Sequence, residues 1–145
     1  MKTNIALLIE QSVNVIDSLN KGLRLTPEEQ QFFCEHFERE EIKKNEFTIR
    51  IGDYEKYLYF IESGILRYWT AQEYGDPDKE ITFWFSFPGE FANSYFSLKE
   101  NQPSLIHIQA LTDCVIWKLS KTAHAASHVT PDIFIPTRSF PSLPT

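Results

Sequence analysis

Residues 47–68 read FTIRIGDYEKYLYFIESGILRY, in which apolar and polar side chains alternate on either side of two glycines. A period of two is typical of half-buried strands, because successive side chains of a strand point to opposite faces of the sheet. Gly52 and Gly64 fall where the alternation breaks, and glycine tolerates the positive φ of a tight turn. The segment therefore predicts short strands joined by tight turns.

The same pattern continues along the middle of the chain. Four of the five glycines separate its apolar runs, with spacings of 12, 11 and 14 residues, at Gly52, Gly64, Gly75 and Gly89. The predicted strands span residues 47–51, 58–63, 65–70, 80–87, 106–110 and 115–119. Short strands at regular intervals indicate a mainly β sandwich or small barrel.

Helical signals lie on both sides of this region. Apolar residues recur at helical spacing over residues 4–19, which predicts an amphipathic N-terminal helix. Thr26, Pro27 and Glu29 form the pattern of a capped helix start, and this second helix should end near Phe37. Four of the eight prolines follow residue 120, so we expect no long helix there beyond a turn or two at 123–129.

Length and composition fit one compact domain. The chain has 145 residues, of which 42% are apolar, and a chain of this size folds around one core without metal or disulfide support. We divide it into an N-terminal helix and linker (1–25), a β domain (26–120) and an irregular proline-rich tail (121–145).

Charge and hydropathy argue against several kinds of partner. The formal net charge of −6 repels polyphosphate, so we expect no direct nucleic-acid binding. No apolar run approaches the ~18 residues of a membrane span, so we expect no membrane contact and a cytoplasmic location. Cys34 and Cys114 lie in core-like segments and are predicted to be buried free thiols.

The ordered motifs 47–53, 59–68, Gly75 and 87–91 resemble the cyclic nucleotide-binding domain of Crp/Fnr transcription regulators. The resemblance implies an effector-sensing domain folded as a double-stranded β-helix, or jelly roll, of about eight strands with N-terminal helices. It also implies that residues 87–91 lead into a phosphate-binding cassette. A long dimerisation helix and a helix-turn-helix module normally follow, and the tail from 121 is too short and too rich in proline for both.

In this family a cassette glutamate binds the ribose and an arginine binds the phosphate. The resemblance implies that Ser94 or Asn93 stands at the glutamate position and Ser104 at the arginine position. No arginine occurs between Phe91 and Ala110. A serine hydroxyl does not offset the charge of a phosphodiester, so ordinary cAMP binding is not expected.

The candidate ligand-binding residues are those of the cassette: Glu90, Phe91, Ala92, Asn93, Ser94, Ser104 and Leu105. Successive N–H groups over residues 90–95, at the start of a short helix, would form a weak anion site. Seven aromatic side chains lie between residues 83 and 96. We predict that most of them belong to the core, although they could instead form the wall of a pocket for a flat ligand.

Three functions stay open at this point. The first is an effector sensor whose small-molecule ligand is cAMP, another nucleotide or an unknown compound; the second is a ligand-free interaction module on the same scaffold. A homodimer is compatible with both. The third is a cupin-like metal protein, but His107 has no histidine two residues away, so we expect no metal site. The motifs of nucleophilic catalysis are missing, and we expect no enzyme activity.

Overall fold

The computed structural model describes residues 5–11, 26–72, 75–76 and 78–126. The elements follow one another in the order α1 (Ile5–Gln11), α2 (Pro27–His36), β1 (Glu38–Ile42), β2 (Phe47–Ile49), β3 (Tyr57–Ser63) and β4 (Leu66–Ala71). They continue with β5 (Glu80–Ser86), β6 (Phe91–Ala92), α3 (Tyr95–Glu100), β7 (His107–Ala110), β8 (Cys114–Ser120) and α4 (Lys121–Ala126).

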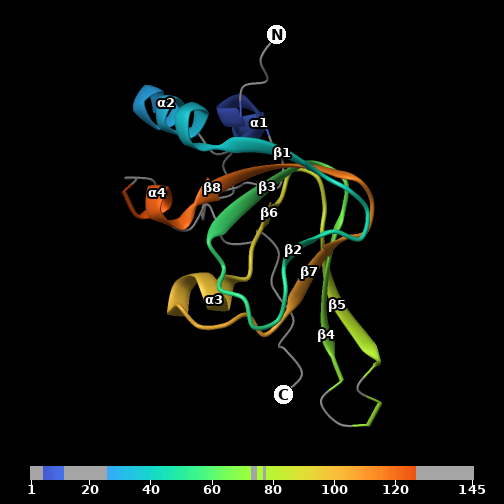
Figure 1. Ribbon diagram of the computed structural model, residues 1–145. Coiled ribbons are helices and arrows are strands. Elements are labelled where there is room, and N and C mark those ends of the chain that lie inside the picture. Colours follow the sequence, from blue (N-terminus) through green and yellow to red (C-terminus); the bar gives the residue numbers. More distant parts are fainter. Residues whose placement is uncertain (1–4, 12–25, 73–74, 77, 127–145) are drawn as a thin grey trace, which may run out of the picture.

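The strands form two four-stranded antiparallel sheets. Their orders are β1-β8-β3-β6 and β2-β7-β4-β5, so the first strand pairs with the last, the second with the seventh, and so on inwards. This nested pairing is that of a jelly roll, and it confirms the mainly β fold expected from the sequence. Figure 1 shows α1 and α2 together beside β1, while the β4–β5 hairpin extends away from them.

Local sequence explains how α2 begins. The Thr26 hydroxyl accepts a hydrogen bond from the Glu29 N–H at 3.1 Å, and the Glu29 carboxylate accepts one from the Thr26 N–H at 2.9 Å. Pro27 occupies the first turn, where an N–H would have no partner. The capping box and the end of α2 next to Phe37 confirm the prediction. Helix α1 covers part of the N-terminal helix predicted over 4–19, and residues 12–25 lie outside the described residues.

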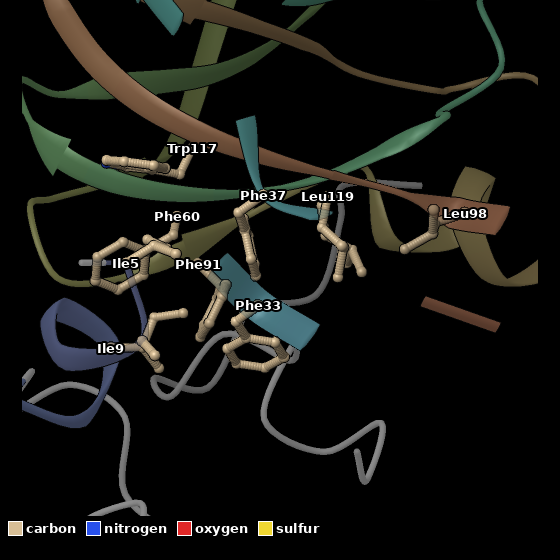
Figure 2. Close-up of a cluster of buried hydrophobic side chains, with 11 residues drawn as sticks. Ile5, Ile9, Phe33, Phe37, Phe60, Phe91, Leu98, Trp117 and Leu119 are labelled. Carbon is tan, nitrogen blue, oxygen red and sulfur yellow. The ribbon is translucent and has the colours of Figure 1, made fainter. Parts of the chain in front are cut away.

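Two apolar clusters share β3. Phe60 and Leu58 face a cluster between the first sheet and the helices, in which Phe33 and Ile9 are buried (Figure 2). The alternate residues, such as Ile61, face a second cluster inside the roll between the two sheets. Both faces of β3 are therefore covered, which explains its nearly continuous apolar sequence.

Three elements differ from the sequence-based expectations. Strand β2 ends at Ile49, and Ile51 lies in a turn with 39% of its surface exposed. Strand β1 is not among the strands predicted from the sequence, because its residues are mostly acidic. It is an edge strand, where charged side chains are common. Helix α4 begins at Lys121, so the tail is not irregular from its first residue.

The two thiols lie in different environments. Cys114 is buried as predicted, but Cys34 is exposed, and the prediction for it was wrong. Among the residues of α2 only Phe33 is fully buried, so the next residue along the helix points towards solvent.

The turn glycines have the backbone that the sequence predicted. All four, including Gly89, have positive φ. Gly64 is the most constrained, because an added Cβ would lie 2.5 Å from the Asp113 carbonyl oxygen and 2.5 Å from Cys114 Sγ. The β3–β4 turn is thus packed against the start of β8.

Candidate functional site

The cassette, defined here as residues 87–106, runs from the β5–β6 turn through α3 to the start of β7. The turn is closed by the buried Glu90, whose carboxylate accepts a hydrogen bond from the Phe87 N–H at 2.7 Å. Helix α3 ends at Glu100 and is capped by Asn101, which has a left-handed backbone with φ of 53°. The predicted site residues from Glu90 to Ser94 therefore lie on one continuous segment.

Ser94 and Ser104 meet at the centre of the cassette. Their hydroxyl oxygens are 2.8 Å apart, and each residue has only 1% of its surface exposed. The Ser104 hydroxyl also donates to the Ile106 carbonyl at 2.8 Å, which leaves Ser94 as the donor to Ser104. These two serines were assigned to the glutamate and arginine positions of the family. They are in contact, and the groups that meet are neutral hydroxyls.

A buried carboxylate from outside the cassette binds the same segment. Glu55 lies in the β2–β3 loop with 4% of its surface exposed, and its Oε2 accepts a hydrogen bond from the Ser94 N–H at 2.9 Å. The Glu55 N–H in turn donates to the Ser97 hydroxyl at 2.9 Å. Burial raises the pKa of Glu55 to about 7, although backbone N–H groups act in the opposite direction.

Sequence reasoning missed Glu55. Its main partner, Ser94, is 39 residues away, and no local pattern distinguishes Glu55 from exposed acids such as Asp53. Only the fold brings the β2–β3 loop against α3.

Three of the cassette N–H groups have acceptors within the chain. The Asn93 N–H donates to the Tyr68 hydroxyl, which also accepts a hydrogen bond from the Ser86 hydroxyl at 2.9 Å. The Glu90 N–H donates to the Phe87 carbonyl at 3.1 Å. Together with the bond from Ser94 to Glu55, these contacts take up three of the six amides of residues 90–95, those of Glu90, Asn93 and Ser94. The weak anion site stays a prediction.

The aromatic side chains near the cassette are mostly not in the core, contrary to our expectation. Phe91 is buried, and Phe83 and Trp84 are half-buried against the cluster inside the roll. The exposed members are Phe85, Phe87, Tyr95 and Phe96. Phe85 is exposed because β5 lies at a sheet edge. Tyr95 and Phe96 are exposed because they lie on the outward face of α3. The candidate Leu105 is also exposed, at 56%, unlike its neighbour Ser104.

A cavity of about 380 Å³ adjoins Glu55. It is lined by β2, the β2–β3 loop and the start of β3, through Thr48, Ile49, Gly52, Asp53, Tyr54, Glu55, Lys56, Tyr57 and Tyr59. None of these residues was a sequence-based candidate. Two of its lining residues, Ile49 and Tyr59, belong to the cluster between the sheets.

The histidines and thiols do not form a metal-binding group in the part of the chain that the structure describes. His107 Nδ1 accepts a hydrogen bond from the Ile51 N–H at 3.1 Å, and the ring centres of His107 and Trp69 are 4.2 Å apart. Burial lowers the pKa of His107 and raises that of Cys114.

None of the described helices is both long enough and apolar enough to cross a membrane.

The family model of the cyclic nucleotide-binding domain matches residues 39–126, which include every strand except the first residue of β1. The chain belongs to the cyclic nucleotide-binding domain family. This confirms the resemblance stated from the motifs. No curated protein matches the chain.

Solved structures share the fold. The catabolite activator protein of Thermus thermophilus is 24% identical, with a TM-score of 0.60 over 70% of this chain and 46% of that one. The regulatory domain of Toxoplasma gondii protein kinase A with cAMP is 20% identical, with a TM-score of 0.67 over 85% and 42%. A regulatory subunit of a cAMP-independent protein kinase A from Trypanosoma cruzi, bound to guanosine, is 19% identical, with a TM-score of 0.61 over 70% and 35%.

The chain thus spans less than half the length of each of these three proteins. At these identities the similarity establishes the fold, a cyclic nucleotide-binding domain of the kind found in Crp/Fnr regulators and protein kinase A regulatory subunits.

Proposed function

We propose that this domain is the effector-sensing part of a Crp/Fnr-type transcription regulator, and that its effector is not a cyclic nucleotide. The role is regulatory rather than catalytic, in the cytoplasm, with a small molecule as the partner. DNA binding would belong to another part of a longer protein, and homodimerisation is part of the proposal.

The charge of the cassette is the observation that carries this proposal. A bound phosphodiester is stable in a buried site only when a cation or several free N–H donors offset its charge. The Ser94 and Ser104 hydroxyls are neutral and bonded to each other, and the nearest carboxylate is that of Glu55. The one cationic side chain of the cassette, Lys99, is on the exposed side of α3 with its Nζ 5.7 Å from the Tyr95 ring centre.

Relatives with this fold are consistent with a different effector. The Trypanosoma cruzi regulatory subunit described above is cAMP-independent and has guanosine bound. A phosphate-free ligand avoids the electrostatic problem that we identify in this cassette. The fold therefore tolerates a sensor whose ligand carries no phosphodiester.

Isothermal titration of the wild-type chain with cAMP and cGMP tests the proposal. We expect no saturable heat. The double variant Ser104→Arg with Glu55→Gln restores the missing cation and removes the competing carboxylate, so it should bind cAMP with a Kd of roughly 1 mM or tighter.

The matched control places the arginine one residue further on. Leu105→Arg with Glu55→Gln adds the same charge at an exposed position and should not gain cAMP binding. Micromolar binding of cAMP by the wild type would contradict the proposed function.

A ligand-free interaction module remains the second candidate, because four aromatic side chains are exposed around the cassette. Two of them, Phe85 and Phe87, have ring centres 6.5 Å apart on the β5–β6 side. Light scattering of the wild type and of Phe85→Ala with Phe87→Ala tests this candidate. Loss of a dimer in the double variant would favour it, and identical masses would count against it.

A further inference from the structure

The cavity beside Glu55 has the layout of a small-molecule site. Its volume of about 380 Å³ falls within the range of ligand pockets. Asp53, Tyr54 and Lys56 are exposed, while Glu55 and Tyr59 are buried in its wall. It therefore has an open side and a shielded interior.

One buried hydroxyl oxygen of the lining, that of Thr48, has no hydrogen bond to a described residue. Tyr59, with 5% of its surface exposed, adds a second hydroxyl group to the same wall. Buried polar groups are normally paired, so an unpaired one in a cavity wall indicates a place for a ligand or water.

Glu55 can accept one more hydrogen bond. Its carboxylate is approached by the backbone N–H groups of Ser94, Tyr57 and Lys56. An ionised carboxylate offers about four acceptor positions, so roughly one is left for a donor in the cavity. Because the Ser94 amide shares this carboxylate, a ligand that binds Glu55 also changes the hydrogen bonding of the cassette.

The charges around the cavity favour a cation. Asp53 and Glu55 are acidic, and Lys56 is the basic residue of the lining. The Lys118 ammonium lies 4.8 Å from the Tyr57 ring centre and 3.4 Å from a Glu40 carboxylate oxygen, so its charge is already paired. The rings of Tyr57 and Tyr59, whose centres are 6.0 Å apart, offer an aromatic surface against which a ligand ring can pack.

We propose that this cavity binds a small arylalkylamine, with the ammonium group on the Glu55 carboxylate and the ring against Tyr57 and Tyr59. The inference rests on the proposed function, in which the effector is not a cyclic nucleotide, and it names the chemical class of that effector.

Three compounds of the same size test the charge requirement: 2-phenylethylamine, 2-phenylethanol and phenylacetate. Titration followed by amide NMR should show saturable binding of the amine, with resonances of Glu55 and Ser94 among those that move. The alcohol should bind about tenfold more weakly, because it cannot form a charge-assisted hydrogen bond, and phenylacetate should not bind.

Two variants test the residues. Glu55→Gln should weaken amine binding about tenfold and leave alcohol binding unchanged within about twofold. Tyr59→Phe keeps the ring and should weaken both compounds by a smaller factor. Glu100→Gln, an exposed position on α3, is the control and should leave all affinities unchanged.

Equal binding of the three compounds, preference for phenylacetate, or no binding of any of them at roughly 10 mM would overturn the proposal. These results are independent of the cAMP titration. A cavity without an amine preference leaves the proposed function standing, whereas cAMP binding by the wild type contradicts the proposed function itself.

Discussion

At the scale of single residues, Glu55 does not titrate like an exposed carboxyl group. Burial raises its pKa from 4.5 to about 7. A folded-state pKa above the unfolded value means that the native state binds more protons between these two pH values. The contribution of Glu55 to the free energy of unfolding is therefore fully present below about pH 4.5 and is lost as the pH rises to about 7.

Urea unfolding of the wild type and of Glu55→Gln at about pH 5 and about pH 8 measures this contribution. Relative to the variant, the wild type should lose up to roughly 3 kcal/mol of stability between the two conditions, since one pKa unit corresponds to about 1.4 kcal/mol. A wild type that gains stability over this range, relative to the variant, would contradict the buried environment of Glu55.

Gly64 and Gly52 are two glycines with similar backbone conformations but different surroundings. Both have φ above 90°, but an added Cβ at Gly52 meets nothing within 4 Å, whereas at Gly64 it meets backbone and Cys114. Gly52→Ala should cost about 1 kcal/mol through strain alone, and Gly64→Ala about 3 kcal/mol or more through strain and overlap. Equal losses in denaturant unfolding would show that the β3–β4 turn is not packed against β8.

At the scale of elements, the start of α2 is a local structure that can be tested locally. Thr26→Ala removes the hydroxyl that caps the Glu29 N–H and should lower the free energy of unfolding by about 1 kcal/mol. Gln31→Ala, at an exposed position in the same helix, is the control and should change stability by less than about 0.5 kcal/mol. A Thr26→Ala protein as stable as the wild type would show that this capping box contributes little.

Elements with a local cause were predictable from sequence, and those that depend on distant partners were not. The capping box at Thr26 and the turn at Gly64 involve neighbouring residues, so pattern and propensity identified them. Strand β1 forms because β8 offers a free edge, and its acidic sequence carries no strand signal of its own. The same limit applied to the site, where Ser94 and Ser104 were identified but Glu55 was not, because it reaches the cassette only through the fold.

At the scale of the whole molecule, nested strand pairing brings three distant segments together at one end of the roll. The β2–β3 loop, the start of α3 and the segment before β7 supply Glu55, Ser94 and Ser104 respectively. In a chain with a net charge of −6, this arrangement places a carboxylate, and no arginine, at the centre of the cassette. Under the proposed function, the positions that hold a cyclic nucleotide in the family are here occupied by groups that bind one another.

Amide NMR of the full chain during a cAMP titration tests this claim most directly, through the resonances of Asn93 and Ser94. Both amides donate to acceptors within the chain, so neither resonance should move at millimolar cAMP. A saturable shift of both amides, with a midpoint in the micromolar range, would show that a phosphate displaces Glu55 and Tyr68, and would contradict the account.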